Sequence, residues 1–282
     1  MADAAPSGRP DPDPAGQPPA DRRRELRVDV LGVEVSCINL ELAVEAFGAW
    51  IAERSRTYVC VTGMHGVMES RRDPALRSIH NASGLTTPDG MPMVWAGRFA
   101  GAAWMTRVYG PDLMDAVCAR AVEEGWRMHF LGGAPGVAAR CAERLSTRFP
   151  GLSVTGTTVP PFRELAAAED DALVAEVNEA RPDIVWVGLG TPKQEFWMHD
   201  HREALEAPVL VGVGAALAFF AGELPQAPRW MQRRGLEWLY RLVREPRRLW
   251  RRYLMNIPRF GLLLLAHPPH LVVDEHRAKE EA

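Results

Sequence analysis

PDIVWVGLGTPKQE, residues 182–195, is the stretch that decides the fold of this chain. Its β-branched residues, Ile184, Val185 and Val187, predict a strand that is buried on both faces. The strand runs into the tight turn Gly188-Leu189-Gly190. A buried strand that ends in a glycine turn is typical of a parallel α/β sheet, in which a helix follows each strand.

The five residues after this turn predict the start of a helix. Thr191 is expected to be the N-cap, Pro192 suits the first helical position, and Gln194 occupies the capping-box position. Such a helix N-terminus carries free backbone N–H groups and a positive dipole end, which suit an anion or a phosphate. Polar side chains at the same helix N-terminus come from Lys193, Gln194 and Glu195. An ordinary capped helix would have the same sequence.

On both sides of this stretch, runs of strand length alternate with segments of helical spacing. This alternation predicts an α/β fold with a mainly parallel, Rossmann-like sheet and helices on both faces. Ligands of such sheets bind beyond the carboxyl ends of the strands. We expect a hairpin over 28–35, strands at 58–61, 128–131, 152–159, 184–189 and 209–213, and helices at 40–54, 67–72, 111–124, 137–148 and 164–180.

Charge is distributed unevenly along the 282 residues. The net charge is −3, yet residues 229–259 contain ten arginines, no lysine and two acids, a local charge of +8 that leaves −11 for the remainder. Pro246 should divide this basic segment into two helices. We therefore expect a disordered Pro/Ala/Asp-rich tail (1–25), an α/β domain (26–222), a basic amphipathic helical appendage (223–265) and a polar tail (266–282).

Cysteine usage and hydropathy indicate a cytoplasmic chain without a membrane span. The longest apolar run, 209–222, is too short to cross a bilayer, and no signal peptide precedes the α/β pattern. The cysteines show no CxxC spacing, so reduced thiols are expected rather than disulfides or a zinc site. They are Cys37, Cys60, Cys118 and Cys141.

The glycine turns at 132–136 and 188–190 invite comparison with a dinucleotide site. Neither matches GxGxxG, and the strand at 153–159 does not end in the acidic residue that would hold an adenosine ribose. A nicotinamide oxidoreductase is therefore disfavoured, while a nucleotide bound in another way stays open. No DxD lies at a strand end and no His/Asp/Glu cluster has ligand spacing, so we expect no metal and no cofactor.

One carboxylate, Asp89, stands in the loop TTPDGMP, residues 86–92. A rigid loop can hold an aspartate as a general base against a substrate hydroxyl. A plain Pro-Asp-Gly β-turn is the alternative. Arg107 is a candidate partner for Asp89 or for a phosphate, and taken alone it is simply a loop arginine.

Six segments in this order resemble the WecG/TagA/CpsF family of bacterial glycosyltransferases, from about residue 29 to residue 260. The resemblance implies transfer of a sugar, often of the N-acetylmannosamine type, from a UDP donor to a lipid-diphosphate-linked sugar in cell-surface polysaccharide synthesis. It also implies inversion at the anomeric carbon, no required metal, and an appendage that meets the membrane. The segments are TPDG (87–90), RVYGPDL (107–113), FLGGAPG (130–136), PDIVWVGLGTPKQE (182–195), VGVGAALAFFAG (211–222) and GLEWLYRLVREPRRLWRRY (235–253).

The resemblance also assigns residues. Asp89 matches the family's proposed base, Thr62, Arg107 and Gln194 match polar residues of its active site, and Arg241, Arg248 and Arg251 match appendage arginines that close over the diphosphate. Arginine suits that role because it binds phosphate through two parallel hydrogen bonds. The glycine turns and the helix N-terminus complete the expected substrate-binding set: Gly133, Gly188, Gly190, Thr191, Lys193, Gln194 and Glu195.

The chain departs from the family pattern at three positions. Met64 stands where Asn is usual, Ala218 where Asp is usual, and Gln226 where Arg is usual, which puts the sugar identity in doubt. A catalytically silent nucleotide-sugar-binding protein is therefore the alternative to an enzyme.

The appendage also predicts partners. Its arginines, together with Trp and Tyr, suit an anionic bilayer rather than nucleic acid, so we expect a peripheral protein at the inner face of the cell membrane. A solvated helical face is the plain alternative. A homo-oligomer stays open.

Overall fold

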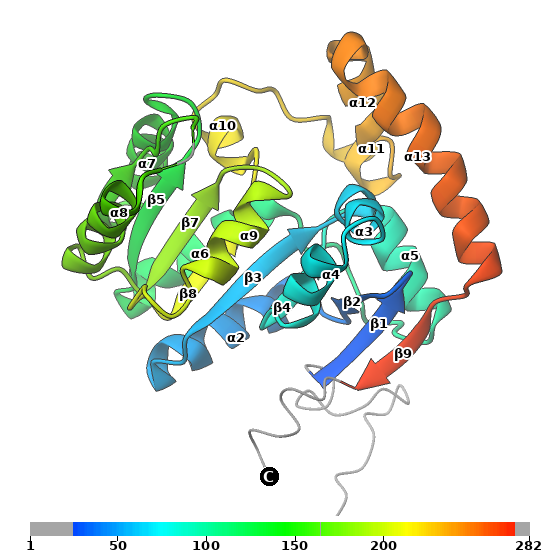
Figure 1. The fold of residues 1–282 in the computed structure, drawn as a ribbon, viewed down its shortest axis with the longest axis horizontal. Helices are drawn as coiled ribbons and strands as arrows, with labels where there is room; N and C mark the ends of the chain where they lie inside the picture. The colour runs from blue at the N-terminus through cyan, green and yellow to red at the C-terminus, as the bar shows by residue number, and fades with distance from the viewer. Residues whose placement is uncertain (1–24, 164, 274–282) are drawn as a thin grey trace, which may run out of the picture.

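The structure, a computed structural model, describes residues 25–163 and 165–273 (Figure 1). The side chains of three arginines in this range, Arg248, Arg251 and Arg252, lie outside the described part. The tail expected over 1–25 lies outside it as well, apart from its last residue, and so do residues 274–282 of the expected polar tail.

The core of the molecule is a six-stranded sheet in which every pair of neighbouring strands is parallel. Its order is β4-β3-β8-β7-β5-β6, and the α/β prediction is confirmed. All carboxyl ends therefore lie at one edge, where a ligand is expected. The strands are β3 (Thr57–Thr62), β4 (Leu85–Pro88), β5 (Arg127–Gly132), β6 (Ser153–Thr158), β7 (Ile184–Gly188) and β8 (Val209–Gly212).

Helices cover both faces of this sheet. Within β7, Ile184 and Trp186 belong to one apolar cluster and Val185 and Val187 to the other, because successive side chains point to opposite faces. The first cluster is closed by α2 (Leu40–Glu53), α6 (Gly110–Glu124), α7 (Val137–Arg148) and α10 (Ala216–Phe220). The second is closed by α4 (Pro74–Asn81), α8 (Ala167–Glu179) and α9 (Lys193–Asp200).

A second, antiparallel sheet lies beside β4, in the order β2-β1-β9. The expected hairpin is confirmed as β1 (Leu26–Val30) and β2 (Val33–Ser36). Its third strand, β9 (His270–Val273), pairs with β1, so this part of the expected polar tail is a strand. A third apolar cluster joins this sheet to α3 (Met64–Ser70), α5 (Met91–Phe99) and Phe260.

The appendage is helical and is broken where Pro246 predicts it. Its helices are α11 (Arg229–Arg233), α12 (Glu237–Arg244) and α13 (Pro246–Ala266). Figure 1 shows them beside α3 and α5, with residues 221–228 leading to them from α10 and β9 following them. The appendage is thus tied to the α/β domain at both ends. None of the helices in the described ranges is both long and apolar enough to cross a bilayer.

The predicted start of the helix after β7 is wrong by one residue. Helix α9 begins at Lys193 with Pro192 as its N-cap, after a cis peptide bond between Thr191 and Pro192. The Thr191 hydroxyl donates to Glu195 Oε1 at 2.8 Å instead of capping the helix. Gln194 does reach back, but its Oε1 accepts from the Gly190 N–H at 3.2 Å, one residue earlier than a capping box requires.

Candidate active site

Asp89 lies directly after β4, at the carboxyl edge of the sheet. Its N–H donates to the carbonyl of Thr62, the last residue of β3, at 3.0 Å. Gly63 makes this approach possible, since a Cβ there would lie 2.5 Å from the Asp89 carbonyl oxygen. Gly90 has a φ of +105° and turns the chain into α5. Two strand ends and two glycines therefore fix the position of the carboxylate.

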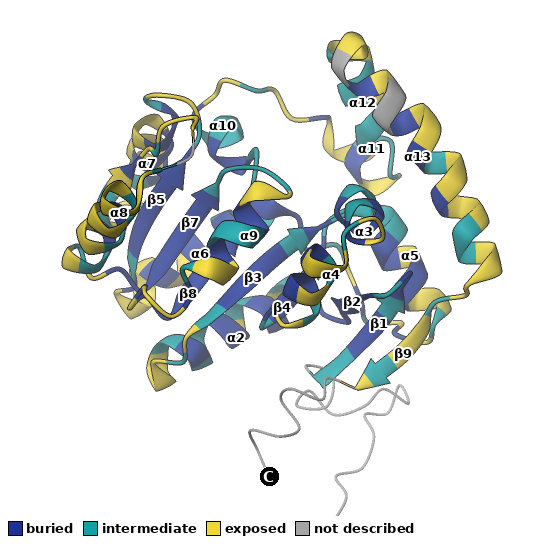
Figure 2. Cartoon of the chain, viewed as in Figure 1, coloured by how far each residue is buried: buried dark blue, intermediate teal, exposed yellow. Residues whose placement is uncertain are grey.

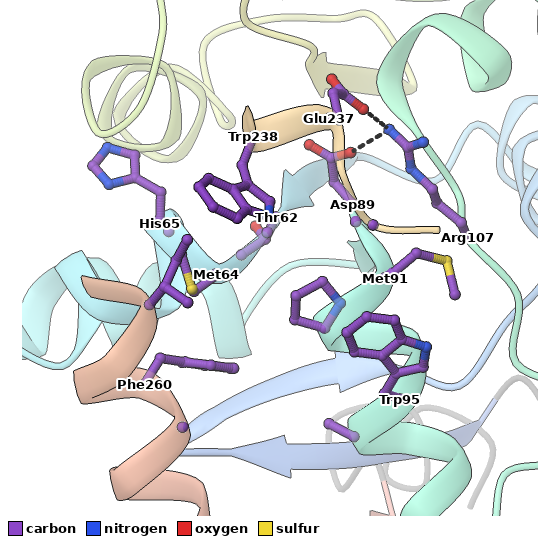
Figure 3. Close-up of a pocket in the computed structure, with 18 of the residues that line it drawn as sticks. Thr62, Met64, His65, Asp89, Met91, Trp95, Arg107, Glu237, Trp238 and Phe260 are labelled. Carbon is purple, nitrogen blue, oxygen red and sulfur yellow. Dashed lines mark hydrogen bonds and ion pairs between the residues drawn. The ribbon is translucent and has the colours of Figure 1, made fainter. Parts of the chain in front are cut away.

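The Asp89 carboxylate faces a cavity of about 760 Å³ between the ends of β3 and β4, helices α3 and α5, and the appendage. Figure 3 shows Thr62, Asp89, Arg107 and Glu237 at its polar end, while Trp95 and Phe260 lie toward the other end. The apolar end is lined by Trp95 and Phe99 of α5 and by Phe260, Leu264 and Leu265 of α13. One cavity therefore joins a polar and an apolar region.

Arg107 lies between two carboxylates. Its Nη2 donates to Glu237 Oε2 at 2.6 Å and lies 3.8 Å from Asp89 Oδ1. Its Nη1 donates to Gln232 Oε1 at 3.3 Å, and its guanidinium lies 4.0 Å from the ring centroid of Tyr109. The side chains of Asp89, Arg107 and Glu237 are 33%, 13% and 19% exposed, so water screens them only partly.

The pKa of Asp89 is raised from 3.8 to about 6, chiefly because burial disfavours the charged form. Arg107 opposes this shift, Glu237 adds to it, and smaller effects come from Arg241, which lowers the pKa, and Asp112, which raises it. A carboxylate with a pKa of about 6 is ionised at neutral pH and is a stronger base than an ordinary surface aspartate.

Thr62 offers a second polar group to the same cavity. The residue is buried, and its hydroxyl has no hydrogen-bond partner in the described part of the chain. A buried hydroxyl without a partner is costly, so a ligand group or a water molecule that pairs with it would be favoured.

The appendage contributes Arg241 to the cavity wall. Arg248 and Arg251 lie on α13, but their side chains are outside the described part of the structure, so their expected closure over the diphosphate stays a prediction. Among residues 25–163 and 165–273, no three His, Cys, Asp or Glu side chains gather as metal ligands would. The four cysteines are buried free thiols.

The glycine turns lie apart from this cavity. The Gly133 N–H donates to the Gly188 carbonyl at 3.0 Å, so it is already paired. A Cβ on Gly190 would meet no atom within 4 Å, and its φ of +78° is what requires glycine. Neither these glycines nor Lys193, which is exposed, lines the cavity.

At the N-terminus of α9, one residue lines the cavity and two residues have a structural role. Thr191 lines the cavity. Gln194 is buried, and its Oε1 also accepts from the Gly214 N–H at 2.9 Å, which ties the loop after β7 to the loop after β8. Glu195 is buried and accepts from the Thr191 hydroxyl. Gln194 and Glu195 thus hold the loops together, and the expectation that they bind substrate directly stays untested.

Several residues of the site are not marked by the sequence. Glu237 is one of two acids in a basic segment, and nothing local places it beside Arg107, 130 residues earlier. Gln232 and Trp238 are likewise brought to the cavity by the appendage. Of the three departures from the family pattern, Met64 lines the cavity, whereas Ala218 and Gln226 do not.

The fold and the cavity together are those of a Rossmann-like α/β enzyme. The family model described as "Glycosyl transferase WecG/TagA/CpsF family" matches residues 28–270, and the chain belongs to this family of glycosyltransferases.

Two relatives in Bacillus are similar over most of the chain. An N-acetylglucosaminyldiphosphoundecaprenol N-acetyl-beta-D-mannosaminyltransferase of Bacillus spizizenii strain W23 is 33% identical over 199 residues, which cover 71% of this chain and 75% of the relative. A protein of the same name from Bacillus subtilis strain 168 is 30% identical over 186 residues, 66% of this chain and 70% of the relative.

Proposed function

We propose that this enzyme transfers a sugar from a UDP donor to a polyprenyl-diphosphate-linked acceptor, with inversion and without a metal, at the inner face of the cell membrane. The observation that carries the proposal is Asp89, a carboxylate with a pKa of about 6 fixed at the carboxyl edge of the sheet, opposite an arginine-bearing appendage. The names of the two relatives support a donor sugar of the N-acetylmannosamine type and an acceptor that ends in N-acetylglucosamine.

In this reaction Asp89 accepts the proton of the acceptor hydroxyl. The hydroxyl oxygen forms a bond to the anomeric carbon from one face while the bond from that carbon to the UDP oxygen breaks on the other, so the configuration inverts. UDP leaves with the bonding electron pair, and its diphosphate gains negative charge. Arg241, which lines the cavity, can balance that charge, and we assign the same role to Arg248 and Arg251.

The two ends of the cavity fit the two ends of such an acceptor. The polar end, with Asp89, Thr62 and Arg107, suits the sugar and the diphosphate, whereas the apolar end between Phe99 and Leu265 suits the first isoprene units. Phe99 and Leu265 are 76% and 81% exposed, which is unusual for large apolar residues and is consistent with a boundary to a bilayer. A UDP-sugar alone would not need the apolar end.

The proposal is tested by incubating the purified enzyme with a panel of UDP-sugars and a short-chain diphosphate-linked N-acetylglucosamine. We expect UDP release and a glycosylated product with one donor, UDP-N-acetylmannosamine first among them, and no change when EDTA is added. The Asp89→Asn enzyme is the control for contaminating transferases.

The alternative function is that of a catalytically silent nucleotide-sugar-binding protein. The observation that favours it is Met64, which lines the cavity at a position where the family usually has Asn. Calorimetry separates it from the enzyme. A UDP-sugar that binds but is never turned over, with any acceptor of the panel, would establish the binding protein. Turnover that is lost in EDTA and restored by Mg²⁺ or Mn²⁺ would contradict the metal-independent mechanism only.

A further inference from the structure

Arg107 is held mainly by the appendage and only weakly by the base beside it. The two acceptors in hydrogen-bond contact with its guanidinium, Gln232 and Glu237, lie on α11 and α12. The Asp89 oxygen, at 3.8 Å, is beyond hydrogen-bond distance. The Glu237 oxygen, at 2.6 Å, has the length of a charge-assisted bond. Figure 3 shows the guanidinium reaching both carboxylates from the same side.

Asp89 competes with Glu237 for the guanidinium of Arg107. A guanidinium within 4 Å of two carboxylates can pair closely with either one. If α11 and α12 move away from the cavity together, Arg107 loses both Gln232 and Glu237, and Asp89 is then the carboxylate left beside it. A direct Arg–Asp pair would stabilise the ionised carboxylate and make it a poor proton acceptor.

We propose that Glu237 is a positioning residue that holds the Arg107 guanidinium away from Asp89, so that Asp89 is free to accept a proton only while the appendage is docked. This role rests on the proposed function, in which Asp89 is the general base. It gives the appendage an effect on the reaction that is separate from its arginines and from its contact with lipid.

The electrostatics agree with the geometry. Arg107 lowers the pKa of Asp89, whereas Glu237 raises it. Removing the Glu237 charge therefore acts twice in the same direction, because the raising charge disappears and Arg107 is released toward Asp89. The titratable and charged groups that face Asp89 from the surrounding elements are Arg107, Tyr109, Asp112, Glu237 and Arg241, with His65 and Arg234 also on the cavity wall.

Glu237→Gln tests the proposal because glutamine keeps the shape of the side chain and a hydrogen-bond acceptor but removes the charge. Glu223→Gln is the matched control, since Glu223 pairs with Arg140 at the other end of the appendage and does not line the cavity. Carboxyl ¹³C NMR of aspartate-labelled protein gives the pKa of Asp89 directly, with its resonance assigned by its loss in Asp89→Asn. This measurement does not depend on turnover.

We expect the pKa of Asp89 to be about one unit lower in Glu237→Gln than in the wild type and unchanged in Glu223→Gln. The acidic limb of the pH profile of kcat/KM should move by the same amount, with kcat on the plateau about tenfold lower. If Glu237→Gln does not fold, Glu237→Asp, which keeps the charge on a shorter side chain, must give a value below that of the wild type.

A pKa of Asp89 that stays the same or rises in the folded Glu237 variant overturns the proposal, even if the variant is less active. A wild-type enzyme that transfers no sugar from any UDP donor overturns the proposed function instead, and the NMR titration still decides the role of Glu237.

Discussion

At the scale of single residues, a carboxylate is a useful base only above its pKa, and burial raises the pKa of Asp89 to about 6. We therefore expect kcat/KM to rise with pH through about 6 and to level off above it, since this profile reports the free enzyme. Asp89→Asn keeps the shape of the loop and should lower kcat by about 10²–10⁴. A mutant with more than half of the wild-type kcat would remove Asp89 from this role.

Ionised Asp89 should lower the stability of the folded state at neutral pH. Because the pKa of Asp89 is raised from 3.8 to about 6, the ionised form is disfavoured in the folded state. The protonated form of Asp89 therefore stabilises the folded state relative to the ionised form. This stabilisation is present below about pH 4, declines between about pH 4 and pH 6, and is fully lost above about pH 6. Asp89→Asn should therefore raise Tm by about 2–4 °C at pH 8, an effect of roughly 1 kcal/mol after allowance for solvent screening.

Thermal unfolding of Asp89→Asn and the wild type across this pH range checks the sign. The gain in Tm should shrink as the pH is lowered toward 4. A mutant that is less stable than the wild type at pH 8 would mean that the pairing of Asp89 with Arg107 outweighs the cost of burial.

The sequence predicts only part of this site. Asp89 stands out because Pro88 and Gly90 make its loop rigid, and Arg107 stands in a neighbouring loop. Glu237 could not be predicted, since its role arises from a contact made across 130 residues. Gln194 resembles a substrate ligand in sequence, yet its side chain is used by the Gly190 and Gly214 N–H groups.

At the scale of elements, we predict that the outer face of α13 contacts the membrane. The buried residues of α13, Leu249, Tyr253, Asn256 and Phe260, recur at helical spacing on the side that faces the rest of the molecule. Tyr253 lies beside Trp238 of α12, and Phe260 belongs to the third apolar cluster. Figure 2 shows exposed residues along the opposite side of the helix. Large apolar side chains on that side are at least 45% exposed, namely Trp250, Leu254, Met255, Leu262 and Leu265. This face suits the interfacial region of a bilayer.

We expect Leu254→Ser combined with Leu262→Ser to weaken binding to anionic liposomes at least tenfold, because each buried leucine is worth about 1.5–3 kcal/mol. Neither residue lines the cavity, so turnover of a water-soluble acceptor should be nearly unchanged. Val122→Ser, on the exposed side of α6, is the control and should leave liposome binding intact. Equal binding of all three proteins would place the membrane contact elsewhere.

Sequence periodicity identifies elements that are long and apolar, and it misses those defined by pairing. Strand β4 has a single aliphatic residue, Leu85, and its threonines are buried because Thr86 and Thr87 donate to the carbonyls of His80 and Val108. Strand β9 becomes a strand only through its pairing with β1. The helices expected at 111–124 and 137–148 match α6 and α7, since their apolar residues recur at helical spacing.

At the scale of the whole molecule, the appendage cannot be removed as a unit. A chain that ends after Gly222 would lose Glu237, the hydrogen-bond partner of Arg107, and it would also lose Phe260 from the third apolar cluster and β9 from the antiparallel sheet. We expect even a chain that ends after Ala266, which keeps α13 and lacks β9, to melt about 5–10 °C lower, since several sheet hydrogen bonds of about 1 kcal/mol each are lost.

Calorimetry of this shortened chain, with the Leu254→Ser and Leu262→Ser protein as a folded reference, measures that loss. Activity on the soluble acceptor should fall with it, because α13 is then anchored at one end only. An unchanged Tm would show that β9 adds nothing to the small sheet.

The pairing of Leu26 with Val273 also sets the order in which the protein can be completed. At about 5–20 residues per second, a ribosome needs on the order of 10–50 s to add the 247 residues from Arg27 to Val273. Throughout that time one edge of β1 has no partner, and α13, which supplies part of the apolar wall of the cavity, is synthesised only near the end of it. Translation itself therefore delays the finished active site until residue 273 has been added to the nascent chain.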